Sequence, residues 1–239
     1  MRETRFFIEG KHAQGDRVTL APGDARKLVS VLRAKSGDTI ELLDSASQRF
    51  SATLEVDGAT VVGILDALLL RPTTELPRRV DLAQALPKGQ KMDDIVERTT
   101  ELGVTRILPF VSERSIVREA PPARIERWNR IARSAAEQSG RERLPLVLDG
   151  LTFPQLLAHF SEYDLVLFAW EMAEENLRAH LSGTGTGNIL LVVGPEGGFS
   201  HVEASSAQDA GAQLIGLGPR IFRTETAALV LLSIVGYEL

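Results

Sequence analysis

The last third of the chain carries two nearly unbroken apolar runs, and each leads into a glycine-containing turn with residues typical of a helix start. Residues 188–193 lead into the turn 194–200, and residues 213–217 lead into the segment 218–227. Strands that are apolar throughout belong in a parallel sheet covered by helices on both faces. Because turns of this kind bind small molecules through their backbone, residues 188–227 constrain both the fold and the site.

From residue 80 onward, predicted strands and helices alternate. The predicted strands are residues 80–86, 106–111, 164–169, 188–193 and 213–217. The predicted helices are residues 90–102, the segment between Pro121 and Gly140, residues 171–181, the segment from Ser200 to Gly211, and residues 224–237. Glycines at helix ends and a capping box at Ser200 and Glu203 set the boundaries. The alternation predicts an α/β fold built on a parallel sheet.

Residues 1–70 show short segments with period-two alternation instead. Strands are predicted at residues 5–8, 17–20, 39–44, 50–56 and 60–65, and a helix only at residues 24–32. This pattern predicts a small β-barrel, which serves either as an RNA-binding module or as plain scaffold. Residues 71–79 contain two prolines and little apolar content, so we expect a linker there. The predicted domains are therefore residues 1–70 and 80–239.

The formal net charge of −5 argues against a nucleic-acid-binding protein, but the charge is unevenly distributed. Residues 106–143 hold nine arginines and five acids, whereas residues 144–211 hold nine acids and one arginine. Arginine suits contacts with phosphate and guanine, which favours RNA. A helix surface with solvated ion pairs explains the same residues, so both interpretations stay open.

Composition disfavours several kinds of site and location. No apolar run approaches the roughly 18 residues of a membrane span, and the N-terminus lacks the apolar core of a signal peptide. The chain has no cysteine, which excludes disulfides and thiolate ligands and fits the reducing cytoplasm. Its four histidines are scattered without metal-binding spacing. We therefore expect a cytoplasmic protein with no metal and no membrane partner.

The turn 194–200 matches neither of two common phosphate-binding motifs. Gly194 and Gly197 lack the three-glycine spacing of a dinucleotide fingerprint, and no Gly-Lys-Ser/Thr follows as in a P-loop. Glycine here lets a ligand lie against the main chain, and Glu196 can accept a hydrogen bond from a ligand. An ordinary connection between strand and helix is the alternative.

The segment 217–227 combines two arginines with helix-start residues. Arg220 and Arg223 flank an apolar pair, so in a loop the apolar pair turns inward while the arginines face a cleft. Thr224 is predicted as the N-cap of the following helix, and Glu225 favours the positive end of that helix. A capped helix with two surface arginines is the alternative.

Six segments, in order along nearly the whole chain, carry a family resemblance. They are residues 30–33 (Ser-Val-Leu-Arg), 88–92 (Lys-Gly-Gln-Lys-Met), 100–104 (Thr-Glu-Leu-Gly-Val), 137–141 (Glu-Gln-Ser-Gly-Arg), 193–199 (Val-Gly-Pro-Glu-Gly-Gly-Phe) and 217–227, which ends in Arg-Thr-Glu-Thr-Ala. With them the chain resembles the SPOUT superfamily of methyltransferases and, within it, the ribosomal RNA small subunit methyltransferase E family.

The resemblance implies a PUA-like β-barrel that binds RNA, followed by an α/β domain with a C-terminal trefoil knot. It implies S-adenosylmethionine as the cofactor, bent within the knotted loops, and a homodimer whose active site borrows from both subunits. The implied reaction is methylation of uracil N3 at one position of 16S ribosomal RNA, with the assembled small ribosomal subunit as partner. Composition and spacing by themselves predict neither the knot nor the cofactor nor the uracil.

Site residues follow from the resemblance position by position. The implied cofactor-binding residues are Gly194, Gly197, Leu217, Gly218, Pro219, Ile221, Phe222, Thr224, Thr226 and Ala227. Arg223 is expected beside the transferred methyl group, with Glu196, Glu225 or water as the proton acceptor. The implied RNA-binding residues are Arg5, Lys27, Arg33, Arg141 and Arg143.

Two positions depart from the family's usual pattern. Ser30 stands where the family usually has histidine, and Phe222 stands where it usually has leucine. An apolar pocket tolerates the second change. The first affects no expected catalytic role, but it argues against RNA recognition through an imidazole at this position. Two alternatives to the uracil-N3 reaction stay open: another RNA target such as the ribose 2′-oxygen, and a non-catalytic RNA-binding assembly factor.

Overall fold

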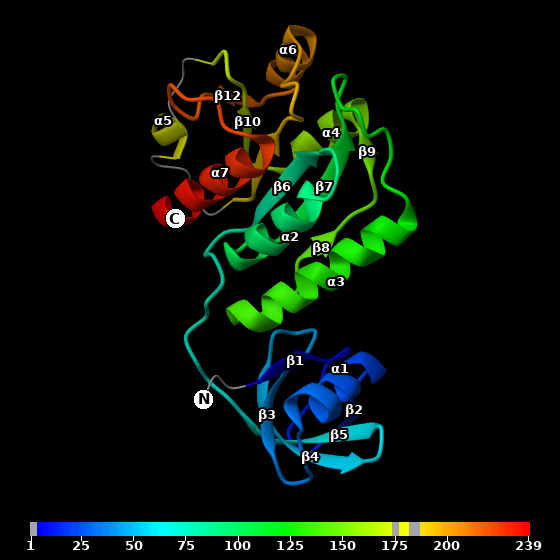
Figure 1. Cartoon of the computed structure of the whole chain (residues 1–239). Coiled ribbons are helices and arrows are strands. Elements are labelled where there is room, and N and C mark those ends of the chain that lie inside the picture. Colours follow the sequence, from blue (N-terminus) through cyan, green and yellow to red (C-terminus); the bar gives the residue numbers. More distant parts are fainter. Residues whose placement is uncertain (1–3, 174–176, 182–186) are drawn as a thin grey trace. The chain divides into compact units, whose positions relative to one another are not determined.

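The computed structural model describes residues 4–173, 177–181 and 187–239. The chain divides into two units: the first comprises Met1–Glu75 and Glu137–Leu144, and the second comprises Leu76–Ala136 and Pro145–Leu239 (Figure 1). The division between Glu75 and Leu76 falls inside the segment 71–79. Residues 137–144, which the sequence places in the second domain, pack with the first unit instead.

The first unit is built on one five-stranded sheet. Its strands are β1 (Arg5–Phe7), β2 (Arg17–Thr19), β3 (Thr39–Leu43), β4 (Arg49–Asp57) and β5 (Thr60–Leu68). Their order is β1-β3-β4-β5-β2, and every pair is antiparallel except β1 with β3. Alternate residues of β4, namely Phe50, Ala52 and Leu54, are buried in the core. The period-two pattern therefore predicted these strands correctly.

The helical segment of the first unit is only partly the predicted α-helix. Residues 24–32 were expected to form one helix, but α1 (Pro22–Arg26) passes into a π-helix at Lys27–Leu32. The segment ends at Arg33, whose φ of 55° is left-handed. The wider π-turn changes the helical phase, and Val31 is left 71% exposed.

The second unit is built on a parallel sheet. Its strands are β6 (Val80–Ala85), β7 (Arg106–Val111), β8 (Leu146–Val147), β9 (Leu151–Thr152), β10 (Leu165–Ala169), β11 (Ile189–Val193) and β12 (Gln213–Ile215). The order is β12-β10-β11-β6-β7-β8, with β9 also on β7, and every pair is parallel. The prediction of an α/β fold on a parallel sheet is confirmed.

Helices cover both faces of this sheet (Figure 1). On one face lie α2 (Lys91–Glu101), α3 (Pro122–Ser139), α5 (Leu177–Leu181) and α7 (Thr224–Glu238), and on the other lie α4 (Phe153–Ala158) and α6 (His201–Asp209). Successive strand residues point to opposite faces, so Leu82 joins the first cluster and Ala83 the second. This double burial explains why β10 and β11 are apolar throughout.

Some elements differ from the sequence predictions. The sequence patterns predict no helix or strand in residues 145–162, yet these residues form β8, β9, α4 and a 3₁₀-helix at His159–Glu162. Two-residue strands are too short to show a period. The helix predicted at residues 171–181 is described only as α5, because residues 174–176 lie outside the described part, as does most of the glycine-threonine run 182–187. Among the described helices, none is long and apolar enough to cross a membrane.

Candidate active site

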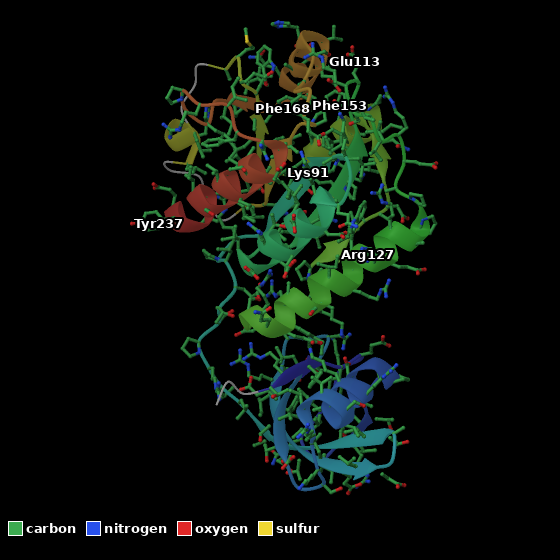
Figure 2. All side chains as sticks on the ribbon, viewed as in Figure 1. Lys91, Glu113, Arg127, Phe153, Phe168 and Tyr237 are labelled. Atoms are coloured by element: carbon green, nitrogen blue, oxygen red, sulfur yellow. The ribbon has the colours of Figure 1, made fainter. Side chains whose placement is uncertain are left out.

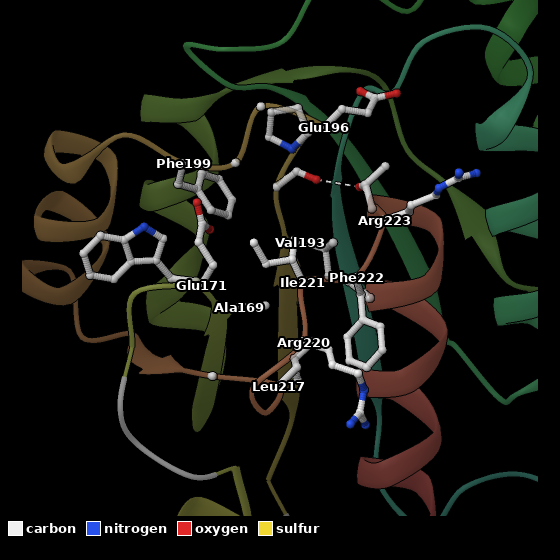
Figure 3. A pocket seen from close by; sticks show the side chains of 18 of the residues that line it. Ala169, Glu171, Val193, Glu196, Phe199, Leu217, Arg220, Ile221, Phe222 and Arg223 are labelled. Carbon is white, nitrogen blue, oxygen red and sulfur yellow. Dashed lines mark hydrogen bonds between the residues drawn. The ribbon is translucent and has the colours of Figure 1, made fainter.

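A pocket of about 540 Å³ opens at the carboxyl ends of β10, β11 and β12, where ligands bind in parallel α/β sheets (Figure 3). Three segments form its walls. They are residues 169–171 after β10, residues 193–199 after β11, and residues 216–224 after β12, together with Ala227. The two turns that the sequence singled out therefore line one cavity, although about 20 residues separate them in the chain.

The turn after β11 needs its glycines because it folds tightly against aromatic rings. A Cβ on Gly194 would lie 2.9 Å from the ring of Phe199. That ring cannot retreat, since it packs on Phe168 at a centroid distance of 4.1 Å. Phe153 and Phe168, which Figure 2 labels, belong with Phe110 and Phe199 to this aromatic cluster. The absence of side chains thus brings the main chain to the pocket wall.

The turn after β12 exposes main chain and arginines. Gly218 has a φ of 99°, a left-handed conformation that favours glycine. Arg220 and Ile221 are exposed, whereas Phe222 packs against the core under α7. The expectation that both apolar residues turn inward is right for Phe222 and wrong for Ile221, which is 88% exposed.

Thr224 has a different role from the predicted N-cap. The N-cap of α7 is Arg223, which makes no side-chain capping bond, and Thr224 is the first helical residue. Its Oγ1 donates to the carbonyl oxygen of Gly194 at 2.5 Å, the bond drawn as a dashed line in Figure 3, and accepts from Gln84 Nε2 at 2.8 Å. The hydroxyl therefore connects two walls of the pocket instead of capping a helix.

Most of the residues that the resemblance assigns to the cofactor lie at this cavity. Those that line it are Gly194, Gly197, Leu217, Gly218, Pro219, Ile221, Phe222, Thr224 and Ala227. Thr226 is not among the lining residues. Of the three residues assigned to the chemistry, Arg223 and Glu196 line the pocket and Glu225 does not.

Lys91, at the start of α2, holds both acids that the sequence offered as proton acceptors. Its Nζ lies 3.0 Å from Oε1 of Glu196 and 3.4 Å from Oε2 of Glu225. Burial by itself raises the pKa of Glu196, but hydrogen bonds from its own backbone, from Lys91 and from the backbone N–H of Lys88 outweigh burial and lower that pKa. The same carboxylates raise the pKa of Lys91.

Arg223 differs from these residues because its guanidinium is exposed at the pocket and makes no hydrogen bond or ion pair within the described residues. The carboxylate of Glu171 is likewise unpaired there, and its Oε1 would lie 2.6 Å from a Cβ on Gly198. An anionic group and a cationic group are thus both available to a ligand.

The sequence reasoning missed the wall formed by Ala169, Trp170 and Glu171. The signal was present, because these residues follow the apolar run of β10 just as the glycine turn follows β11. It also missed Gln84, a buried polar residue near the end of β6 whose amide donates to Thr224.

The five predicted RNA-binding residues, all in the first unit, fall into two groups. Arg5 pairs with Glu41 at 2.7 Å, Lys27 with Glu137 at 2.9 Å, and Arg141 with Glu75 at 2.6 Å. Burial by itself raises the pKa of Glu75, but the Arg141 guanidinium and the backbone N–H groups of Glu142 and Arg143 together outweigh burial and lower that pKa. Arg141 is only 4% exposed, and its guanidinium is engaged in an internal ion pair with Glu75.

Arg33 and Arg143 form the second group. Both are exposed, and their side chains make no ion pair within the described residues. They are therefore the two members of the predicted set that are accessible to phosphate. Elsewhere in the described part of the chain, no three His, Cys, Asp or Glu side chains are grouped so as to hold a metal ion.

Comparison with known proteins places this geometry in a family. The model of the RNA methyltransferase domain matches residues 74–236. The chain is 34% identical to ribosomal RNA small subunit methyltransferase E of Bacillus subtilis, over 98% of this chain and 96% of the relative. It is 36% identical to the protein of the same name from Synechocystis, over 90% of this chain and 71% of the relative.

Solved structures agree with the sequence comparison. A ribosomal RNA small subunit methyltransferase E from Neisseria gonorrhoeae, bound to S-adenosyl methionine, superposes with a TM-score of 0.88 at 33% identity, covering 99% of this chain and 98% of that one. A methyltransferase from Legionella pneumophila with bound cofactor SAM superposes with a TM-score of 0.89 at 28% identity and the same coverage. The chain therefore belongs to the RNA methyltransferase family and, within it, to the ribosomal RNA small subunit methyltransferase E group.

Proposed function

We propose that the protein transfers the methyl group of S-adenosylmethionine to N3 of a uridine in 16S ribosomal RNA, the uridine numbered 1498. The observation that carries the proposal is the unpaired Arg223 at the edge of a pocket whose walls are largely main chain. Membership of the family supplies the cofactor and the ribosomal target.

The pocket residues fit this cofactor. Glycine-lined turns leave main-chain groups free to hydrogen-bond an adenosyl group, and unpaired Glu171 suits the positive charges of a sulfonium and an ammonium. Residues 194–198 and 217–222 would hold S-adenosylmethionine, which supplies an activated methyl group when bound. Arg223 would face the uracil.

The residues of this chain then have two tasks in the reaction: stabilising negative charge on the uracil and accepting its N3 proton. N3 of uracil carries a proton, and its lone pair becomes available when that proton leaves. Arg223 stabilises the negative charge that develops on the uracil oxygens. Because N3 lies on the base-pairing edge, the target base must be unpaired or turned out of its stack.

Glu196 is the side chain best placed to accept the N3 proton, since Glu225 lies outside the pocket lining. Its lowered pKa keeps the carboxylate ionised throughout the neutral range. A rate that depends on Glu196 should therefore fall only below the usual glutamate pKa of about 4.3.

Replacing Lys91 by methionine is expected to move the acid limb of the pH–rate profile, where the rate falls as Glu196 is protonated, to higher pH. The substitution removes the ammonium that lowers the pKa of Glu196 and leaves the burial that raises it. The measurement is the pH profile of kcat/KM for both proteins, with Lys88→Met as a control for the loss of one lysine charge. An acid limb that stays in place would assign the proton to water instead.

The finer features of the fold belong to the same proposal. A C-terminal trefoil knot is supported by the strand order, because β12 lies beyond β10 while β11 lies on its other side. A PUA-like barrel for residues 1–70 is supported by the five-stranded, mostly antiparallel sheet. Residues 71–79 would be the linker and residues 80–239 the catalytic domain.

A homodimer is supported by the outer face of α7. Ile234 is 39% exposed and Tyr237, which projects from the last turn in Figure 2, is 89% exposed. Exposed apolar residues one turn apart on an apolar helix form an interaction surface. Tyr237→Asp is expected to convert a dimer to a monomer in light scattering, whereas Leu70→Asp, at an equally exposed site, should leave the mass unchanged. If Tyr237→Asp leaves the molar mass unchanged, α7 is not part of the dimer interface.

The decisive experiment is methylation of purified small ribosomal subunits and of free 16S RNA with labelled S-adenosylmethionine. Nucleoside mass spectrometry should find the label as 3-methyluridine, and more of it on assembled subunits. A label on the ribose would favour 2′-O methylation. RNA affinity that falls with salt, without any label, would favour a binding factor. A ribosomal substrate would place the protein in the cytoplasm.

A further inference from the structure

Gln84 is a fully buried polar side chain in β6, and it lies behind the pocket wall without lining the cavity itself. Its Nε2 donates to the carbonyl oxygen of Ala85 at 3.0 Å and to Oγ1 of Thr224 at 2.8 Å. Because a carbonyl oxygen only accepts, the amide nitrogen must be the end that faces Ala85. Its Oε1 has no hydrogen-bond partner within the described residues.

Such a side chain is poorly explained by stability. An amide buried with one end unsatisfied loses hydration that it does not regain, and an apolar side chain of the same shape fills the space without that loss. Buried polar groups left partly unsatisfied often have a functional reason. The explanation for Gln84 therefore lies in what its amide nitrogen holds.

The amide of Gln84 determines where the hydroxyl of Thr224 points. A hydroxyl has one hydrogen, and because Gln84 donates to Oγ1, that hydrogen remains free for the carbonyl oxygen of Gly194. The result is a chain of hydrogen bonds from β6 through the first residue of α7 to the glycine turn. Its members lie 140 and 30 residues apart in sequence.

Thr224 and Gly194 both line the pocket, on two different walls. We infer that Gln84 is a positioning residue for the cofactor: it fixes the Thr224 hydroxyl on Gly194 and so sets the spacing of the two walls before the ligand arrives. Walls fixed in advance lose less freedom on binding, which raises affinity. The inference rests on the proposed function, since it assumes that S-adenosylmethionine occupies this pocket.

The test is a mutant cycle of Gln84→Met, Thr224→Val and the double variant, with binding of S-adenosylmethionine measured by calorimetry without RNA. Gln84→Met should raise the Kd about three- to tenfold, the range for losing one such hydrogen bond. The double variant should bind no more weakly than Thr224→Val, because one break already interrupts the chain. KM for the cofactor should rise, while KM for RNA and kcat at saturation stay unchanged.

Gln84→Glu is a second variant that keeps the side-chain volume. A carboxylate only accepts, so it draws the Thr224 hydrogen away from Gly194 and should also weaken cofactor binding. Thr99→Val is the matched control: Thr99 is fully buried, and its hydroxyl donates to the carbonyl oxygen of Ile95 at 2.6 Å within α2. It should lower the melting temperature and leave the Kd unchanged.

The outcomes separate the inference from the proposed function. If the unsubstituted protein and both Gln84 variants bind the cofactor equally well, the positioning role is wrong and the proposed function stands. A lower melting temperature with an unchanged Kd, or strictly additive effects in the cycle, would also overturn the role. No binding by the unsubstituted protein would overturn both.

Discussion

Replacing Arg223 by alanine is expected to lower kcat about 100- to 1,000-fold, the cost of removing one donor aimed at developing charge. The Kd for S-adenosylmethionine should change by less than about twofold, because the substitution to alanine leaves in place the backbone that lines the pocket. Arg223 lines the pocket and is exposed, and its guanidinium makes no hydrogen bond or ion pair within the described residues, so that group is free for substrate. Single-turnover methylation and calorimetry measure the two quantities separately.

Arg220→Ala is the matched comparison for Arg223→Ala. Arg220 lies on the same turn, lines the same pocket and is also exposed. If the reaction needs only positive charge at the pocket edge, both substitutions should lower kcat alike. If Arg223 stabilises the uracil oxygens, its loss should be much the larger. Equal losses in kcat and in cofactor affinity for Arg223→Ala would contradict the assigned role.

Replacing Gly194 by alanine is the second large effect, and it should appear in binding and in stability together. The new Cβ would lie 2.9 Å from the ring of Phe199, which the neighbouring aromatic rings hold in place. The turn must therefore move. Overpacking of this kind costs about 1–3 kcal/mol of stability. If displacement of the wall lowers the binding free energy by the same amount, the Kd rises about 5- to 150-fold.

Gly23→Ala is the control for this substitution. A Cβ on Gly23, in the first unit, meets no atom within 4 Å, so the melting temperature should not fall and the Kd should not rise. Thermal melts with and without S-adenosylmethionine distinguish the two positions. A Gly194→Ala protein that binds the cofactor normally would show that the turn does not form the wall.

Local patterns predicted the parts of the fold that depend on local burial. β10 and β11 were visible as apolar runs because both of their faces are covered. Their neighbours in the sheet were not visible, since no periodicity states that β12 pairs with β10 and not with β11. The residues after β10 were recognisable as the end of an apolar strand, but the sequence did not show that β10 lies between β11 and β12, where Ala169 and Glu171 complete the pocket.

Long-range contacts likewise decided which side chains remain available. Thr224 has the chemistry of an N-cap, and only tertiary structure supplies Gln84 and Gly194 as its partners. Arg141 has the chemistry of a phosphate ligand, and only tertiary structure supplies Glu75, which lies 66 residues away. The residue type indicated which interactions each side chain can make, and the tertiary structure determined which of these interactions it makes.

The position of α7 has a consequence for the folding of the protein during its synthesis. Leu231, Leu232 and Val235 are fully buried in the core shared with α2 and β6, and the turn before α7 supplies one wall of the pocket. A nascent chain whose last helix is still inside the ribosomal tunnel has an open core and an unfinished pocket. The protein should therefore gain affinity for its cofactor only after α7 has emerged from the tunnel and packed against α2 and β6.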